Sequence, residues 1–370
     1  MTVTQPDPAI VRIDVAAYSI PTDAPEADGT LAWDSTTVVV VHAHAGGRRG
    51  MGWTYGSAAA AHLIHETLEP LLCGRSAFDV SGANGRMSKA VRNIGRPGIA
   101  ATAISAVDVA LWDLKARLLD LPIIGLLGAT RESTPAYGSG GFTTYDDQQT
   151  TKQVQQWIDD CGITMVKIKI GESWGTCADR DLQRVAIVRK LIGDRALFVD
   201  ANGGYDVGQA VRVGHALDEL GVSWFEEPVS SDNLPGLNTV RQALMADVTA
   251  GEYGWDLPYF YRMIAAEAVD CLQIDATRCG GITEFLRAAA TAAAANLEVS
   301  AHCAPHLHGS FGSAVSNLRH IEYFHDHSRI EERLLFDGAR QPSTGQLTPS
   351  GECGHGYVLR EADAEQWRVA

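Results

Sequence analysis

The sequence between residues 165 and 252 contains four short motifs: Val166-Lys167-Ile168-Lys169, Val199-Asp200-Ala201-Asn202, Trp224-Phe225-Glu226-Glu227-Pro228 and Ala250-Gly251-Glu252. Each motif closes a short apolar run, which is typical of a buried strand. Asp200, Glu226 and Glu252 are spaced 26 residues apart, so strand–helix units of one length would bring them to one mouth of a parallel barrel. Three carboxylates at one place repel each other unless a cation lies between them, and oxygen ligands suit Mg²⁺. The motifs therefore predict a divalent-metal site with Lys167 and Lys169 beside it.

The chain from residue 134 to residue 336 repeats a pattern of strand and then helix. Stretches of helical length, such as 178–192 and 281–295, separate the apolar runs. Eight runs read as strands: 135–139, 163–170, 196–201, 222–227, 248–252, 271–275, 298–303 and 320–324. Eight strands with intervening helices predict an α/β fold with a (β/α)₈-type barrel, in which catalytic residues gather at the C-terminal ends of the strands.

Residues 1–133 follow a different pattern, which predicts a separate α+β unit. Strands are expected at 10–18, 36–44 and 51–55, and helices at 57–73 and 98–120. The second helix is expected to end before Pro122, because proline disfavours helix at the preceding residue. Residues 21–30 are rich in Pro, Asp and Gly and predict a loop. The tail, 337–370, is expected to pack back on the N-terminal unit.

Composition limits the classes of partner. The chain has 370 residues and is 45% hydrophobic, so it can bury a large core in more than one domain. A formal net charge of −15 argues against nucleic acid, which needs basic surfaces. Seven scattered cysteines without a CxxC pair favour reduced thiols over disulfides or a zinc site. The N-terminus lacks the basic and apolar segments of a signal peptide, and the Ala-rich run 288–295 is too short to span a bilayer. We expect a cytoplasmic protein with no membrane partner.

The later strands of the predicted barrel also end in ionisable residues. Asp275 closes the sixth strand, His302 lies at the end of the seventh, and Glu322 lies on the eighth. Any one of these residues, taken alone, is explained as well by a solvated or structural polar group such as a helix N-cap. Ionisable groups at the ends of consecutive strands favour an active site instead.

The sequence resembles the enolase superfamily, and within it the mandelate racemase subgroup, over most of the chain. The resemblance is carried by Ala106-Val-Asp-Val-Ala-Leu-Trp-Asp113, by Pro122 and Leu126-Leu-Gly128 after it, and by the strand-end residues described above. It implies a modified TIM barrel of (β/α)₇β type at 134–336. It also implies an N-terminal α+β capping domain at 1–133, completed by the C-terminal segment 337–370. One Mg²⁺ per active site, held by Asp200, Glu226 and Glu252, is implied as the cofactor.

The subgroup's shared step is removal of the proton α to a carboxylate, and the resemblance implies a role for each strand-end residue. Lys169 would be the base on one face, with Lys167 lowering its pKa by like-charge repulsion. His302, oriented by Asp275, would be the acid or base on the opposite face. Glu322, if protonated, could donate a hydrogen bond to the enediolate oxygen, and the less favoured alternative is that it is the partner of a nearby arginine.

Two bases on opposite faces support more than one overall reaction. Loss of a β-hydroxyl, with His302 protonating it, dehydrates an acid sugar to a 2-keto-3-deoxy acid, and the resemblance favours this outcome. Return of a proton from the other face gives a racemase or epimerase, and a lactone cycloisomerase is a further alternative. The sixth strand ends in Asp275 without the lysine of a related subgroup, which counts against a muconate-cycloisomerase-like enzyme. A barrel that only binds a sugar acid is the non-enzyme alternative.

The substrate is expected to be a small carboxylate, and its contacts are expected from four residues outside the core set. Trp33 and Tyr55 lie in cap segments that, by resemblance, close over the barrel mouth, and residues 21–33 would form a mobile lid. Asn202 could support the metal site or form a turn. Arg278 is a candidate partner for a second substrate carboxylate, which leaves mono-acid and di-acid sugars open. We expect a homo-oligomer between a dimer and an octamer.

Overall fold

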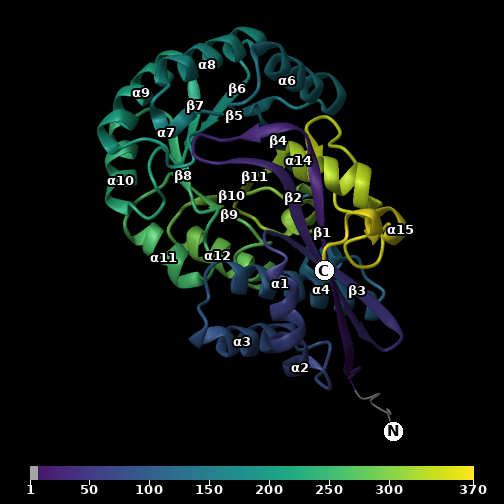
Figure 1. Ribbon diagram of the computed structural model, residues 1–370. Coiled ribbons are helices and arrows are strands. Elements are labelled where there is room, and N and C mark those ends of the chain that lie inside the picture. Colours follow the sequence, from purple (N-terminus) through teal and green to yellow (C-terminus); the bar gives the residue numbers. More distant parts are fainter. Residues whose placement is uncertain (1–6) are drawn as a thin grey trace.

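The structure is a computed structural model that describes residues 7–370, shown in Figure 1. The prediction that the N-terminus carries no signal peptide falls largely on residues 1–6, which lie outside the described residues. No helix within 7–370 is long and apolar enough to cross a membrane.

A closed parallel barrel forms the larger part of the fold, as predicted. Its eight strands are β4 (Thr134–Gly140), β5 (Met165–Lys169), β6 (Ala196–Asp200), β7 (Val222–Glu226), β8 (Asp247–Ala250), β9 (Cys271–Ile274), β10 (Glu298–Ala301) and β11 (Leu318–Phe324). Neighbouring strands pair in chain order, and the parallel pair β11–β4 closes the barrel.

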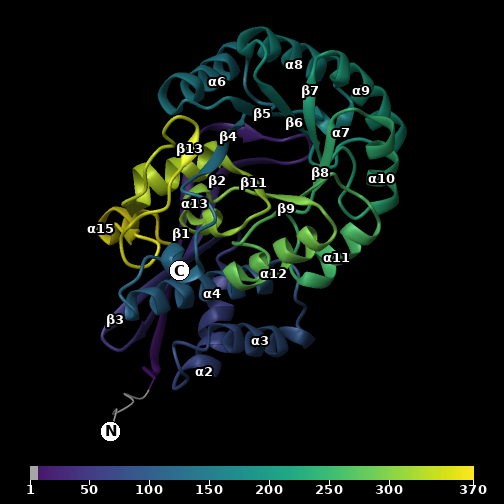
Figure 2. The same ribbon diagram turned by 180° about the vertical axis from the view of Figure 1, so that it is seen from behind.

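Helices connect the barrel strands and form an outer ring, which Figure 2 shows from behind. They are α6 (Asp147–Cys161), α7 (Glu172–Gly175), α8 (Ala178–Ile192), α9 (Val207–Glu219), α10 (Leu234–Ala243), α11 (Leu257–Ala265), α12 (Gly281–Ala294) and α13 (Pro305–Phe311). Seven connections between eight strands give the (β/α)₇β arrangement. Side chains two residues apart on a strand face the same side, so Tyr137, Phe198 and Trp224 fill the barrel interior below the strand ends.

The N-terminal part is a three-stranded antiparallel sheet packed on helices. Its strands are β1 (Ile10–Ala27), β2 (Ala32–Ala45) and β3 (Arg48–Tyr55), in the order β1-β2-β3. Its helices are α1 (Ala59–Leu63), α2 (Glu69–Leu72), α3 (Val80–Ala90), α4 (Ile99–Leu118) and α5 (Ile123–Leu127), with a π-helical turn at Ile64–Leu68. Gly50 and Gly52 let β3 lie directly on α4, because a Cβ at Gly52 would collide with the Ala106 carbonyl oxygen and the Ala110 nitrogen.

The prediction of a loop at 21–30 was wrong. Strand β1 continues to Ala27, pairs Glu26 with Trp33, and turns only at residues 28–31. A register shift between Pro21 and Glu26 absorbs the irregular segment, and β1 is an edge strand, where proline is tolerated. The tip of this hairpin contacts the barrel, since the Thr143 hydroxyl donates to the Asp28 carbonyl at 2.8 Å. Helix α3 was not predicted.

The C-terminal segment runs from the barrel back to the N-terminal sheet. It contains α14 (His325–Ser328), a π-helical turn at Arg329–Leu335, β12 (Phe336–Asp337), β13 (Gln346–Leu347), β14 (Val358–Leu359) and α15 (Glu361–Ala364). The Val369 nitrogen donates to the Ala17 carbonyl at 2.8 Å, which joins the end of the chain to β1. Buried Glu331 accepts hydrogen bonds from Trp53 Nε1 (3.0 Å) and the Tyr55 hydroxyl (2.9 Å) of β3, so it ties the cap to the segment that follows the barrel.

Candidate active site

The predicted metal ligands converge at the C-terminal end of the barrel. Asp200 ends β6, Glu226 ends β7, and Glu252 follows β8. One oxygen of each carboxylate lies within 4.8 Å of the others, and all three side chains are buried. Burial and the neighbouring Asp200 raise the pKa of Glu226 to about 8, and Glu252 Oε2 is buried without a hydrogen-bond partner. Excess negative charge and an unpartnered carboxylate oxygen fit Mg²⁺, which prefers oxygen ligands.

The two lysines of β5 are bound to these carboxylates. Lys169 Nζ lies 2.5 Å from Asp200 Oδ2, and Lys167 Nζ lies 2.6 Å from Glu226 Oε1. Burial lowers the pKa of Lys169 and so does Lys167, but the carboxylates of Asp200, Glu252 and Glu226 together outweigh both and raise it. Lys167 does lower the pKa of Lys169 by like-charge repulsion, as expected, but the carboxylates determine the net direction. A divalent ion held by Asp200 would compete with Lys169 for this carboxylate and would favour the neutral lysine that a base requires.

His302 and Asp275 form a hydrogen-bonded pair on the other side of the triad. His302 Nδ1 lies 2.9 Å from Asp275 Oδ2, and the other oxygen of Asp275 accepts from the Thr277 nitrogen and hydroxyl, both at 2.7 Å. Burial alone would raise the pKa of Asp275, but the His302 hydrogen bond and charge outweigh burial and lower it. Asp275 is therefore ionised and holds a proton on Nδ1, which directs Nε2 toward Glu252 Oε2 at 3.4 Å.

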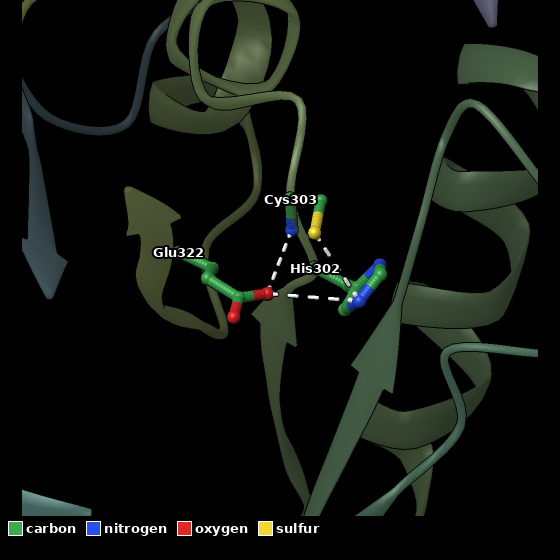
Figure 3. A group of neighbouring side chains, drawn as sticks. All are labelled: His302, Cys303 and Glu322. Atoms are coloured by element: carbon green, nitrogen blue, oxygen red, sulfur yellow. Dashed lines mark hydrogen bonds and ion pairs between the residues drawn. The ribbon is translucent and has the colours of Figure 1, made fainter. Parts of the chain in front are cut away.

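The neighbours of Glu322 favour its ionised form over the protonated form that was suggested for it. It lies 2.8 Å from Lys167 Nζ and accepts from the Ser139 hydroxyl at 2.6 Å. Burial raises the pKa of Glu322, but the charges of Lys167, His302 and Lys169 together outweigh burial and hold it well below its usual range. Figure 3 shows the second oxygen facing the Cys303 nitrogen (2.9 Å) and His302 (3.7 Å). An ionised Glu322 accepts hydrogen bonds and cannot donate one, and its cationic partner is a lysine rather than an arginine.

The four candidate substrate contacts do not lie together. Tyr55 and Arg278 line a cavity of about 570 Å³ between the cap and the ends of β7–β9, beside Tyr253 and Ser231. Arg278 Nη1 lies 3.2 Å from Glu252 Oε1, which places its positive charge next to the triad.

Trp33 and Asn202 have other surroundings. Trp33 lies on the other side of the mouth, edge-on to Phe142 at 5.6 Å, and its Nε1 donates to Glu26. Asn202 has a left-handed backbone (φ +46°), and its backbone nitrogen donates to Asp200 Oδ1 at 2.9 Å, so it forms the turn that orients Asp200. Its side-chain oxygen is buried without a partner, so a second role at the metal site stays open.

Three neighbours of the site were not predicted: Ser139, Glu227 and Cys303. Ser139 is paired with Lys167 across β4 and β5, so only the strand register reveals it. Glu227 is buried with a left-handed backbone (φ +38°), and burial and Glu252 raise its pKa well above the usual value. Cys303 Sγ lies 3.3 Å from His302 Nε2, as Figure 3 shows. Glu227 and Cys303 could have been identified from the sequence, because they directly follow Glu226 and His302.

Comparison with known proteins agrees with this geometry. The family model for the mandelate racemase / muconate lactonizing enzyme N-terminal domain matches residues 12–128, and the model for the enolase C-terminal domain-like family matches residues 149–363. L-talarate/galactarate dehydratase of Salmonella typhimurium is 31% identical over 329 residues, which cover 87% of this chain and 79% of that protein. Other relatives at 28–31% identity are named as a cycloisomerase and an epimerase.

Solved structures show the same fold. A mandelate racemase/muconate lactonizing enzyme-like protein from Rubrobacter xylanophilus is 43% identical, with a TM-score of 0.94 and coverage of 98% of this chain and 100% of that chain. The Salmonella dehydratase liganded with Mg and L-lyxarohydroxamate is 28% identical, with a TM-score of 0.89 and coverage of 100% and 95%. The chain belongs to the mandelate racemase subgroup of the enolase superfamily, whose enzymes use Mg²⁺.

Proposed function

We propose that the protein dehydrates an acid sugar to a 2-keto-3-deoxy acid, with Asp200, Glu226 and Glu252 as the Mg²⁺ ligands. One observation carries the proposal: a lysine and a histidine lie at opposite ends of the carboxylate triad. Lys169 contacts Asp200 at 2.5 Å, and His302 Nε2 lies 3.4 Å from Glu252. A substrate carboxylate at the triad would therefore have a proton acceptor on one side and a proton donor on the other.

The residues divide the reaction between them. Lys169, released from Asp200, takes the α-proton. Mg²⁺, when bound, supplies positive charge beside the substrate carboxylate and so stabilises the charge that develops there. His302 gives the proton on Nε2 to the β-hydroxyl, which leaves as water, and Asp275 stabilises the imidazolium before that transfer. Lys167 keeps Glu322 ionised, so Glu322 can accept a hydrogen bond from a substrate hydroxyl. The resulting enol then tautomerises to the 2-keto acid.

The cavity beside the triad supports a polar substrate that carries more than one acceptor. Arg278 provides a fixed positive charge at the boundary between this cavity and the triad, where a second carboxylate or a hydroxyl of the sugar could bind. Named relatives that act on talarate and galactarate, which are di-acids, agree with this reading. Tyr55 lies beside His327 at 3.5 Å between ring centroids, so it forms a rigid wall of the cavity.

A screen of aldonic and aldaric acids for release of 2-keto acid, with Mg²⁺ present, tests the reaction. Release from at least one acid that is abolished in Lys169→Ala and in His302→Asn supports the proposal. His62→Asn, which changes an exposed histidine on α1, should leave the activity unchanged.

The same two-sided site can instead return the proton from the other face, which is the second candidate function. Exchange of the α-proton in D₂O without 2-keto acid would identify a racemase or epimerase, and consumption of a lactone would identify a cycloisomerase. Neither release nor exchange with any acid, in Mg²⁺-loaded protein, would refute catalysis and favour a barrel that only binds a sugar acid.

We also propose that the protein is a cytoplasmic homo-oligomer. All seven cysteines are unpaired in the structure, which supports a reducing compartment. Sedimentation at several protein concentrations would measure the oligomeric state, and a concentration-independent monomer would contradict this part of the proposal.

A further inference from the structure

A second group of metal-ligating side chains lies outside the active site, between the β1–β2 hairpin and α14. Asp23 and Glu26 belong to β1, and His325 begins α14, directly after β11. One oxygen of each carboxylate and one nitrogen of His325 lie within 4.8 Å of one another. His325 Nε2 already lies 3.1 Å from Asp23 Oδ1. In Figure 1 the hairpin extends from the cap over the end of the barrel, and α14 lies beside it.

Glu26 is a buried carboxyl group in which only one of the two oxygens has a hydrogen-bond partner. The residue is 1% exposed, and Oε2 accepts from Trp33 Nε1 at 2.8 Å, whereas Oε1 is buried and has no hydrogen-bond partner. Leaving such an oxygen without a donor or a cation is costly. The neighbouring Arg329 does not fill the gap, because its guanidinium is directed to Asp326 Oδ1 and to the Pro21 carbonyl.

We propose that Asp23, Glu26 and His325 bind a divalent transition-metal ion of the Zn²⁺ class, separate from the Mg²⁺ of the active site. An imidazole nitrogen with two carboxylates is a ligand set that suits zinc, whereas Mg²⁺ prefers oxygen ligands only. Three protein ligands leave a coordination position for water. An ion can reach this position, because Asp23 and His325 both line a cavity of about 320 Å³ that also contains Lys152 and Gln149.

The charges around the site agree with a divalent ion. Asp23, Glu26 and the buried Asp326 contribute three carboxyl groups, and Arg329 is the cation that is hydrogen-bonded to one of them. Burial and the neighbouring Asp326 raise the pKa of Glu26 to about 9, which reflects the crowding of carboxyl groups around it.

A bound ion would join two segments that are about 300 residues apart in sequence. Asp23 and His325 are separated by 302 positions, and the hairpin that carries Asp23 and Glu26 also carries Trp33, which packs against Phe142 after β4. The ion would therefore fix the hairpin to the end of the barrel next to the strand that holds Glu322. It would act as a structural link and take no part in proton transfer.

Zinc binding to the Mg²⁺-saturated full chain tests the proposal, with calorimetry and elemental analysis as readouts. We expect one Zn²⁺ per chain in the wild type, and a rise in unfolding temperature on adding Zn²⁺. Glu26→Gln and His325→Asn should each weaken Zn²⁺ binding more than about 10-fold, since even an indirect partner of a metal ligand contributes 10-fold or more. His62→Asn is the matched control, because His62 also lies against a carboxylate (Glu66, 3.4 Å) but has no third ligand.

The variants are chosen to stay folded. Glutamine at position 26 has nearly the size and shape of glutamate, and it retains an oxygen for Trp33 Nε1. The unfolding temperature of each variant without zinc verifies folding, and Asp23→Asn, at a more exposed position, repeats the test if Glu26→Gln is unstable. The proposal is overturned if the Mg²⁺-saturated protein takes up no zinc. It is equally overturned if these variants bind zinc as the wild type does, or if zinc is lost only when Glu226→Gln removes a ligand of the active-site triad.

Discussion

Replacing Asp275 by asparagine is expected to disable the His302 side of the active site while leaving the fold and the metal ligands intact. Asp275 Oδ1 accepts two hydrogen bonds from Thr277, so the amide of an asparagine would keep its oxygen there. Its NH₂ group would then face His302 Nδ1, which Asp275 Oδ2 now contacts at 2.9 Å. His302 would have to carry its proton on Nε2 and accept at Nδ1, so a neutral imidazole, which is a far weaker acid than the imidazolium, would have to donate the Nε2 proton.

The size of the effect follows from the charge that is lost. Imidazolium and carboxylate charges at a separation of about 4 Å attract each other by about 4 kcal/mol at an effective dielectric constant of about 20. Asparagine removes this stabilisation of the protonated histidine. At about 1.4 kcal/mol for each factor of ten in rate, turnover should fall about 10³-fold, and the wrong tautomer adds to the loss.

Steady-state turnover of the acid sugar that the screen identifies, together with calorimetric Mg²⁺ affinity, would measure this effect. Turnover should fall while Mg²⁺ affinity stays within about twofold, because Asp275 lies outside the triad. Thr277→Val is the control: it removes one of the two hydrogen bonds to Oδ1, keeps the backbone donor, and should cost less than about tenfold. Turnover of Asp275→Asn within tenfold of the wild type would refute the assigned role of the pair.

Three further predictions concern pH, packing and the metal. Burial lowers the pKa of His306, but the hydrogen bonds that it donates to Glu331 and Glu332, together with the charges of these carboxylates, outweigh burial and raise it to about 10. The stabilisation that protonated His306 gives to the fold is therefore complete below about pH 6.5 and is lost as the pH rises toward 10. Denaturant titrations should show the free energy of unfolding fall by a few kcal/mol over this range in the wild type. The same measurement should change less with pH in His306→Gln. Gly52→Ala should lower the unfolding temperature strongly, at a cost of about 3 kcal/mol, because the new Cβ collides with α4, whereas Gly85→Ala, with open space around it, should be neutral or slightly stabilising. Chelation should abolish turnover and added Mg²⁺ restore it, and Glu226→Gln should raise the Mg²⁺ concentration needed at least about 10-fold, whereas activity that survives exhaustive chelation would contradict the metal assignment.

The barrel and the position of its acidic residues could be predicted because both follow from the regular spacing of strands along the sequence. Strands and helices of constant length return each strand end to the same mouth, so Asp200, Glu226 and Glu252 had to be neighbours once the barrel was recognised. The same rule placed His302 near Asp275 on adjacent strands, and their side chains are 2.9 Å apart. No packing detail was needed for these conclusions.

Protonation states and irregular segments could not be predicted, because they depend on tertiary contacts that the regular spacing of strands and helices does not determine. The charge of Glu322 is decided by Lys167 and by Ser139, which reach it through the closing strand pair β11–β4 and the pair β4–β5. Composition indicated a loop at 21–30, but pairing with β2 and the contact of Glu26 with Trp33 make residues 21–27 a strand. Local sequence preference was overridden there by tertiary contacts.

The excess of buried negative charge at the strand ends favours a cation at the carboxylate triad. Three fixed cations face the strand ends (Lys167, Lys169 and Arg278), against six buried carboxyl groups: Asp200, Glu226, Glu227, Glu252, Asp275 and Glu322. His302 can balance one more when it is protonated. The remaining excess appears as the raised pKa values of Glu226 and Glu227 and as the unpartnered oxygen of Glu252. A divalent ion at the triad would supply the missing positive charge and displace Lys169 from Asp200. Mg²⁺ held by these carboxylates would therefore also release the proposed base from its ion pair.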